Sequence, residues 1–312
     1  MQKNIKRVLL LIMMLTFIIF YSLPAMAASK GCMIKEYQIK QYYKTNGSWK
    51  SGEDAGTKYH KYRISYNKEG DPVTITDRAV LTSGKTSSNG TTSFKYTYKK
   101  GKTVKRTSGG HVVKYKKGVP SKETWKGEEG NKNSVRFKYK NRYATSVKTY
   151  KEASSSEDND TNQTLTFKVS AKNGLPVKIT GKEGNDISPP GIITYTITFY
   201  TSGAKKGLVK EAVRELTIDY HMNEDTWVYR DAYKFSYKVK KGLVTKATQT
   251  GSLTTTANGK ENNREDVKNV FTFKYNNTKV SKKRYCSMIN DIVANELGAD
   301  SYGRLLLYTS WY

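Results

Sequence analysis

Aromatic and polar residues alternate along most of the chain, a pattern that predicts strands with one buried face and one wet face. In the segment Phe94–Lys99, all three aromatic residues fall on one face, and two lysines and a threonine fall on the other. This follows because side chains of a strand point alternately to opposite faces. Gly101 then turns the chain back into a second segment, 103–107, which completes a hairpin.

This hairpin recurs along the chain, with an aromatic strand, a short Lys, Asn or Gly turn, and a return segment rich in Val, Lys and Thr. Such turns supply the residues that tolerate positive φ, as a tight hairpin requires. Eight hairpins predict about sixteen strands. The expected fold is therefore all-β, a large curled antiparallel meander that is either an open sheet or barrel-like. The further copies begin at Tyr62, His111, Val135, Leu165, Ile193, Tyr233 and Phe271.

Longer polar segments separate the hairpins, and their uneven lengths explain why the repeat has no fixed period. Because no change in composition marks a boundary between domains, we expect one repetitive domain over residues 28–312. The expected loops are 83–93, 152–163, 183–191 and 251–269.

The hydrophobic period changes after the last hairpin. Met288, Ile289, Ile292 and Val293 follow helical spacing, and Gly298 is placed to end the helix. We therefore expect an amphipathic helix at about 287–297. Asp291 lies off the apolar stripe, so we expect it on the solvent side of a helix that packs on the sheet or closes its open end.

The N-terminus has the three parts of a secretory signal peptide. Three basic residues precede an apolar run from Val8 to Tyr21, and Ala25-Met26-Ala27 provides a cleavage site. An uncleaved anchor is the alternative, although the run is short for a bilayer span. No later apolar stretch approaches that length. We expect residues 1–27 to be removed and the protein to be secreted or held at the cell surface.

The chain is strongly basic, and this property biases its partners toward polyanions. Removal of the signal peptide lowers the formal net charge from +28 to +25. A lysine recurs directly after the strand aromatic or its equivalent, on the predicted wet face. A simpler explanation is that any wet face carries such residues for solubility. The candidate polyanion-binding residues are Lys95, Lys114, Lys138, Lys168 and Lys274.

Only two cysteines occur, Cys32 and Cys286, at opposite ends of the chain after signal cleavage. Export would permit one disulfide between them, which could stabilise the fold by up to ~5 kcal/mol. Two unpaired thiols are the alternative, since spacing alone does not bring two cysteines within bonding distance.

Motifs for catalysis and cofactor binding are largely missing. The three histidines stand far apart, without metal-ligand spacing, and the glycines are explained by turns. We expect no metal, no cofactor and, on balance, no enzymatic activity. Paired carboxylates of a glycan hydrolase could still come from distant strands. The leading locus for such chemistry is Asp219-Tyr220-His221 with Trp227 nearby, and Glu224 is a further candidate acid.

The units 94–108 and 235–248 resemble the YD/RHS-type repeats of secreted and surface proteins of bacteria. The shared rhythm is aromatic-x-aromatic, a turn glycine, an aliphatic residue and threonine, with Tyr-Lys or Tyr-Asn in place of the family's Tyr-Asp. The resemblance implies a curled antiparallel sheet and a location at the cell surface. It assigns a role to no residue.

Three functions remain open on the sequence. The first is a non-enzymatic exported β-repeat protein that binds anionic polymers of the envelope or other polyanions. The second is a secreted hydrolase acting on glycans. The third is an outer-membrane β-barrel, which fits less well because consecutive basic residues such as Lys105 and Arg106 would place charge on both faces of a strand. The sequence sets no oligomeric state.

Overall fold

The computed structural model describes residues 31–45, 47–51, 56–127, 130–140, 143–152, 161–184, 191–220 and 225–295, so the predicted signal peptide lies outside the described residues. Its elements are eighteen strands followed by one helix. They are β1 (Gly31–Thr45), β2 (Ser48–Ser51), β3 (Thr57–Tyr66), β4 (Pro72–Leu81), β5 (Thr86–Ser93), β6 (Lys95–Lys99), β7 (Lys102–Ser108), β8 (His111–Lys116), β9 (Val119–Lys126), β10 (Lys132–Lys140), β11 (Tyr143–Lys151), β12 (Thr161–Lys172), β13 (Leu175–Gly184), β14 (Gly191–Phe199), β15 (Val209–Tyr220), β16 (Asp225–Lys240), β17 (Leu243–Ala257), β18 (Lys260–Val280) and α2 (Lys282–Asn295).

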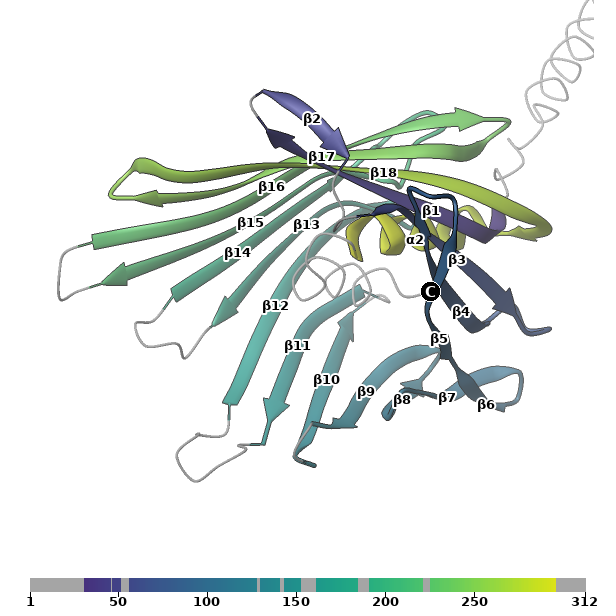
Figure 1. Ribbon diagram of the computed structural model, residues 1–312. Helices are drawn as coiled ribbons and strands as arrows, with labels where there is room; N and C mark the ends of the chain where they lie inside the picture. Colours follow the sequence, from purple (N-terminus) through teal and green to yellow (C-terminus); the bar gives the residue numbers. More distant parts are fainter. Residues whose placement is uncertain are drawn as a thin grey trace, which may run out of the picture.

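All eighteen strands belong to one antiparallel sheet that curls into a nearly closed barrel (Figure 1). Strands that follow one another from β6 to β18 pair as neighbours, and β1 pairs with both β18 and β3. Between β5 and β6 the sheet is connected by the chain itself. Strand β5 pairs with β4, the chain then passes through Phe94 into β6, and β6 pairs with β7. The expected all-β meander with one C-terminal helix is confirmed.

Tight turns join many of the strands, as the sequence predicted. The turn Lys100-Gly101 has positive φ at both residues, and so does Asn258-Gly259. This is the combination that a type I′ hairpin turn requires. The second turn lies inside 251–269, an expected loop that the structure instead builds as the ends of β17 and β18.

The segment 83–93 was also expected to be a loop, and most of it is strand β5. Its Ser, Thr and Asn side chains are exposed and carry no alternation of apolar and polar residues. Pairing with β4 supplies its backbone hydrogen bonds. The missing alternation is the reason the sequence pattern failed here, because a strand that buries neither face leaves no hydrophobic period.

The aromatic and aliphatic set lines the inner face of the barrel, and Lys and Thr occupy the outer face. On β6, the two tyrosines are partly buried while Lys95, Thr97 and Lys99 are exposed, as the alternation predicted. The same pattern repeats on β10, β14 and β16. Buried members of this core include Ile39, Val135, Phe137, Phe167, Ile197, Phe235, Phe271 and Phe273.

Helix α2 lies inside the curled sheet rather than on an outer surface (Figure 1). It begins at Lys282, five residues before the predicted start, and its last described residue is Asn295. One face, with Tyr285, Ile289 and Val293, is fully buried in the core. The expected solvent side is wrong for Asp291, because the opposite face of the helix meets an internal pocket that this residue lines.

Two polar side chains fasten the helix to the sheet. The Tyr285 hydroxyl accepts a hydrogen bond from the Val244 amide at 2.6 Å. Asn290 accepts from the Val209 amide and donates to the Gly207 carbonyl, both at 3.0 Å. Because these backbone groups are buried, the two side chains satisfy donors and acceptors that water does not reach.

Within the described ranges, no helix combines the length and the apolar character needed to cross a membrane.

Candidate polyanion-binding surface

The five lysines predicted to bind polyanions are all exposed on the outer face of the sheet. They do not form one row, however. Lys95 faces Thr107, and Lys168 faces Thr180. Lys138 faces Ser146, and Lys274 faces Glu36. Of the five, only Lys114 has a basic residue directly opposite it on each neighbouring strand.

Lys114 belongs to a row of basic residues that crosses five adjacent strands, β7 to β11. Each member is the register partner of the next, and all but the half-buried Lys122 are exposed. We call this row the cationic ladder; its members are Lys105, Lys114, Lys122, Arg136 and Lys148. With neighbouring strands about 4.8 Å apart, five positions extend over about 19 Å.

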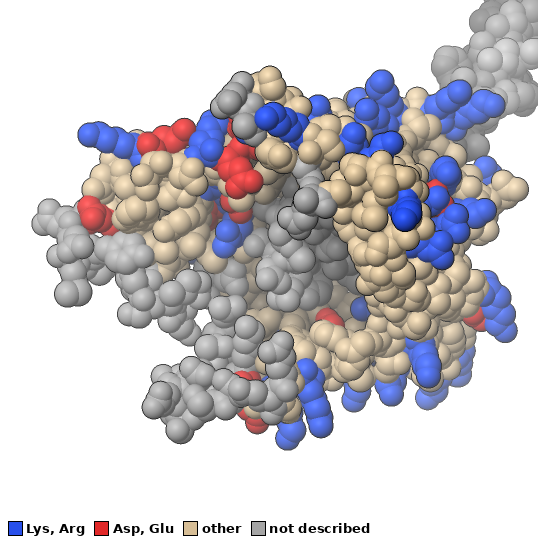
Figure 2. Space-filling model, viewed as in Figure 1, with Lys and Arg blue, Asp and Glu red and all other residues tan. Residues whose placement is uncertain are grey.

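In the part of the chain that the structure describes, no acidic side chain neutralises the cationic ladder. Among the described residues, no carboxylate lies within ion-pair distance of any of its five members. Like charges placed directly opposite each other across a sheet destabilise it. In Figure 2, lysine and arginine side chains project along the lower edge of the molecule, where Figure 1 places β6 to β10.

Two shallow cavities flank the ladder on the outer face. One, of about 570 Å³, is lined by residues that include Lys122, Arg136 and Tyr150. The other, of about 330 Å³, is lined by Ser134, Arg136, Lys148 and Tyr150. The two cavities share Ser134, Arg136 and Tyr150, and of these three only Arg136 belongs to the ladder. A bound chain would therefore meet hydroxyl and aromatic groups as well as charge.

Lys274 lies in a different electrostatic environment. Glu36, whose side chain is only 7 % exposed, is surrounded by Lys61 Nζ, Arg63 Nε and Lys274 Nζ at 3.0 to 3.2 Å. Burial alone would raise the pKa of this carboxyl, but hydrogen bonds from the three cations lower the pKa to about 2. Lys274 is thus partly neutralised, unlike Lys114.

The candidate locus for hydrolysis is only partly described. Backbone pairing places Asp219 opposite Thr226, one position from the pair of Ile218 and Trp227. His221 and Glu224 lie outside the described residues. In the part of the chain that the structure covers, no group of three or more His, Cys, Asp or Glu residues could hold a metal ion.

Both cysteines are buried as separate thiols. Lys279 Nζ lies 3.3 Å from Cys32 Sγ, and Cys286 Sγ donates to the Lys206 carbonyl at 3.4 Å. Burial raises the pKa of Cys286 to about 11, since a low-dielectric surrounding disfavours the thiolate. The disulfide remains a prediction.

Four ladder residues, Lys105, Lys122, Arg136 and Lys148, were not among the predicted candidates. Each is basic and lies on the polar face of its strand, and many other residues of this chain share these two properties. What distinguishes these four is the register between strands. The sequence pattern of a single strand does not contain that register.

Comparison with known proteins gives no family for this chain. No family model matches the sequence, and no curated protein matches it. Among solved structures, a porin-like protein from Bacteroides uniformis is similar, with 13 % identity and a TM-score of 0.48 over 77 % of this chain and 96 % of that one. A porin-like protein from Bacteroides vulgatus is similar at 9 % identity, with a TM-score of 0.41 over 80 % of this chain and all of that one.

Proposed function

We propose that this chain is an exported, non-enzymatic protein that binds a linear polyanion at the cell envelope through the cationic ladder. The observation that carries the proposal is the row of five register partners with no acidic neighbour among the described residues. Like charges placed opposite each other in four strand pairs lower the stability of the fold. A polyanion would relieve that repulsion, and release of its counterions would add to the binding free energy.

The direction of the ladder favours a flexible chain over a flat bilayer. The row runs across the strands and therefore around the convex outside of the curled sheet (Figure 1). A planar headgroup surface would touch few members of such a row at once, whereas a polymer can follow it. A barrel inserted in a membrane needs an outward apolar band. The outer face here carries Lys114, Arg136 and Lys148, so we assign this face to water.

Binding of inorganic polyphosphate to the chain without residues 1–27 tests the proposal. We expect affinity that falls steeply as the salt concentration rises from 0.05 to 0.5 M. The triple variant Lys114→Gln, Arg136→Gln, Lys148→Gln should bind at least tenfold more weakly. If each lost contact behaves like one on a single-stranded phosphodiester, its log–log salt slope should be shallower by roughly 2.

A matched triple variant provides the control, because it removes the same net charge from the same face. Lys95→Gln, Lys138→Gln, Lys168→Gln takes three exposed lysines whose register partners are Thr or Ser. It should bind within threefold of the unmodified chain. Equal weakening by both triple variants would show that net charge alone drives binding. Binding to vesicles containing phosphatidylglycerol but not to polyphosphate would also reject the proposal.

A further inference from the structure

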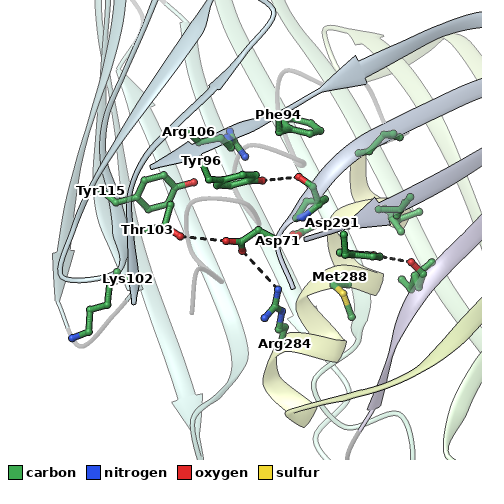
Figure 3. Close-up of a pocket in the computed structure, with 17 residues that line it drawn as sticks. Asp71, Phe94, Tyr96, Lys102, Thr103, Arg106, Tyr115, Arg284, Met288 and Asp291 are labelled. Carbon is green, nitrogen blue, oxygen red and sulfur yellow. Dashed lines mark hydrogen bonds and ion pairs between the residues drawn. The ribbon is translucent and has the colours of Figure 1, made fainter. Parts of the chain in front are cut away.

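A pocket of about 390 Å³ lies inside the barrel, between helix α2 and the strands from β3 to β8 (Figure 3). This volume is within the range of small-molecule sites. Its position is independent of the cationic ladder, which is on the outer face.

Most of the pocket wall is apolar. On the sheet side, Ile64, Ile75, Phe94 and the rings of Tyr96 and Tyr115 line it. Met288 and Ile292 cover it from the helix. In Figure 3, the labelled aromatic rings lie across the cavity from the helix. Such a surface would bury the apolar body of a ligand by the hydrophobic effect.

One acidic residue at the pocket is fully engaged by the protein. Asp71 accepts a hydrogen bond from the Tyr98 hydroxyl at 2.7 Å and another from Thr103 at 3.3 Å. Arg284 Nη2 lies 3.8 Å from its other oxygen. Asp71 and Arg284 therefore balance each other and form a fixed part of the wall.

The second acid, Asp291 of α2, is in a different situation. Its Oδ2 accepts from the Ser287 hydroxyl at 3.4 Å. Its Oδ1 is shielded from solvent and has no hydrogen-bond partner among the described residues. An unsatisfied buried acceptor costs about 1–3 kcal/mol, so a donor from a ligand would be favourable here. Burial raises the pKa of Asp291 to about 7, which a nearby ammonium group would lower again.

A basic group comes from the opposite wall, on β7. Arg106 faces inward as the register partner of Tyr96, and its guanidinium carbon lies 5.6 Å from the centre of the Phe94 ring. Lys102, at the start of the same strand, is the register partner of the outward-facing Lys99, and in Figure 3 its side chain points away from the cavity. In Figure 3, Arg106 comes from a strand facing the helix that carries Asp291. The two walls thus present opposite charges across an apolar cavity.

From this arrangement we infer that the pocket binds a small zwitterion with an apolar body, such as a hydrophobic dipeptide, with its ammonium group toward Asp291 and its carboxylate toward Arg106. A fatty acid would leave Asp291 without a donor. A simple alkylamine would bring a single positive charge into a pocket whose walls already carry Arg106 and Arg284. Only a ligand of both signs complements both walls.

Calorimetric titration of the chain without residues 1–27 with leucyl-phenylalanine tests the inference. We expect saturable binding with one site per chain. The N-acetylated dipeptide and the C-terminal amide should each bind at least tenfold more weakly, because each loses one of the two charges. Laurate and dodecylamine, which carry one charge each, should also bind at least tenfold more weakly.

Two variants test which wall of the pocket recognises each charge of the ligand. Asp291→Asn keeps the side-chain shape and should abolish the preference for the free amine over the acetylated form. Arg106→Met should reduce the preference for the carboxylate over the amide. Asp266→Asn is the control, since that carboxylate lies on the outer face beside Lys44. Circular dichroism of each variant verifies folding.

Three results would overturn the inference. They are no binding of hydrophobic dipeptides, equal affinity for the free and acetylated forms, and an unchanged preference in folded Asp291→Asn. Because the cationic ladder is on the other face, the polyphosphate experiment is unaffected by each of these results.

Discussion

Lys274 Nζ lies 3.0 Å from Glu36 Oε1, and this contact separates Lys274 from the other four candidate lysines, Lys95, Lys114, Lys138 and Lys168. The register of β1 and β18 makes the two residues direct partners. Glu36 also contacts Lys61 and Arg63 of β3, so one carboxylate joins three strands at the place where the barrel closes. This cluster should therefore stabilise the closure.

Replacing Glu36 with glutamine should lower the free energy of unfolding by about 1–3 kcal/mol at pH 7, because three cations would lose their shared hydrogen-bond acceptor. The folded pKa of Glu36 is about 2, below its unmodified value of 4.5. Its contribution is therefore complete above about pH 4.5 and disappears as the pH falls toward 2. Urea denaturation at pH 7 and pH 3 should show the difference between the two proteins shrinking at the lower pH.

Glu215→Gln is the matched control for that experiment. Its partner Arg230 Nε is 3.6 Å away, and both side chains are close to half exposed. Surface pairs of this kind contribute about 0–1 kcal/mol, so the variant should be nearly neutral. A loss as large as that of Glu36→Gln would contradict the special role of the closure cluster.

The cationic ladder should make the stability of the unbound protein depend on salt. Arg136 has Lys122 and Lys148 as its two register partners. At 0.02 M salt, Arg136→Gln should raise stability by about 0.2–1 kcal/mol, since it removes two like-charge contacts. The gain should disappear at 0.5 M, where screening is strong. Lys168→Gln, whose partner is Thr180, should show no such gain at either salt concentration.

The sequence predicted the faces of the strands well and the alignment of the lysines poorly, for a physical reason. Alternation is a local property, so Lys114 could be assigned to the wet face from its own strand. Its partner across the turn depends on a bulge between Lys114 and Tyr115. A regular two-residue hairpin would place Ser121 opposite Lys114, whereas the bulge brings Lys122 there. Such bulges are not encoded in the hydrophobic period.

The helix was also predicted only in part, because its own sequence does not reveal what packs around it. Its 3.6-residue period predicted its existence from Met288, Ile289, Ile292 and Val293, and the structure confirms it. The sequence did not predict that both faces would be enclosed, because periodicity distinguishes apolar from polar faces but does not reveal what covers the polar one. The pocket beside Asp291 was missed for this reason.

Asn290→Ala should destabilise the protein by about 2–4 kcal/mol. The substitution leaves the Val209 amide and the Gly207 carbonyl without their partner in a buried place. Thermal and urea unfolding would measure the loss. Asn276→Ala removes an exposed hydrogen bond to the Thr278 amide and should cost well under half as much. Similar effects of the two substitutions would contradict the anchoring role of Asn290.

The two cysteines offer a direct chemical test. As buried thiols, Cys32 and Cys286 should not react with iodoacetamide at pH 8 in the folded protein. The raised pKa of Cys286 further lowers its thiolate fraction. After denaturation without a reducing agent, mass spectrometry should detect two alkylated residues. Detection of none until a reductant is added would show that the two cysteines form a disulfide.

Asp291 should give the protein a pH dependence opposite in sign to that of Glu36. Its pKa in the folded protein is raised to about 7 from 3.8, so the folded chain keeps a proton that the unfolded chain releases between about pH 4 and 7. Stability must then fall as the pH rises through this range. The groups that share its pocket, Asp71, Arg106 and Arg284, are present in both proteins of the comparison. The difference in the free energy of unfolding between the unmodified protein and Asp291→Asn therefore reports the effect of this carboxyl alone.

The variant should be close to the unmodified protein in stability at pH 4.5 and more stable by about 2–4 kcal/mol at pH 8.5. Urea denaturation at several pH values between these limits would trace the difference. A difference that stays constant with pH would mean that Asp291 titrates normally and that its surroundings are wet. An increase with pH, in contrast, would show that this carboxyl is held out of water with no partner of its own, which is the condition for a ligand's ammonium group to bind there.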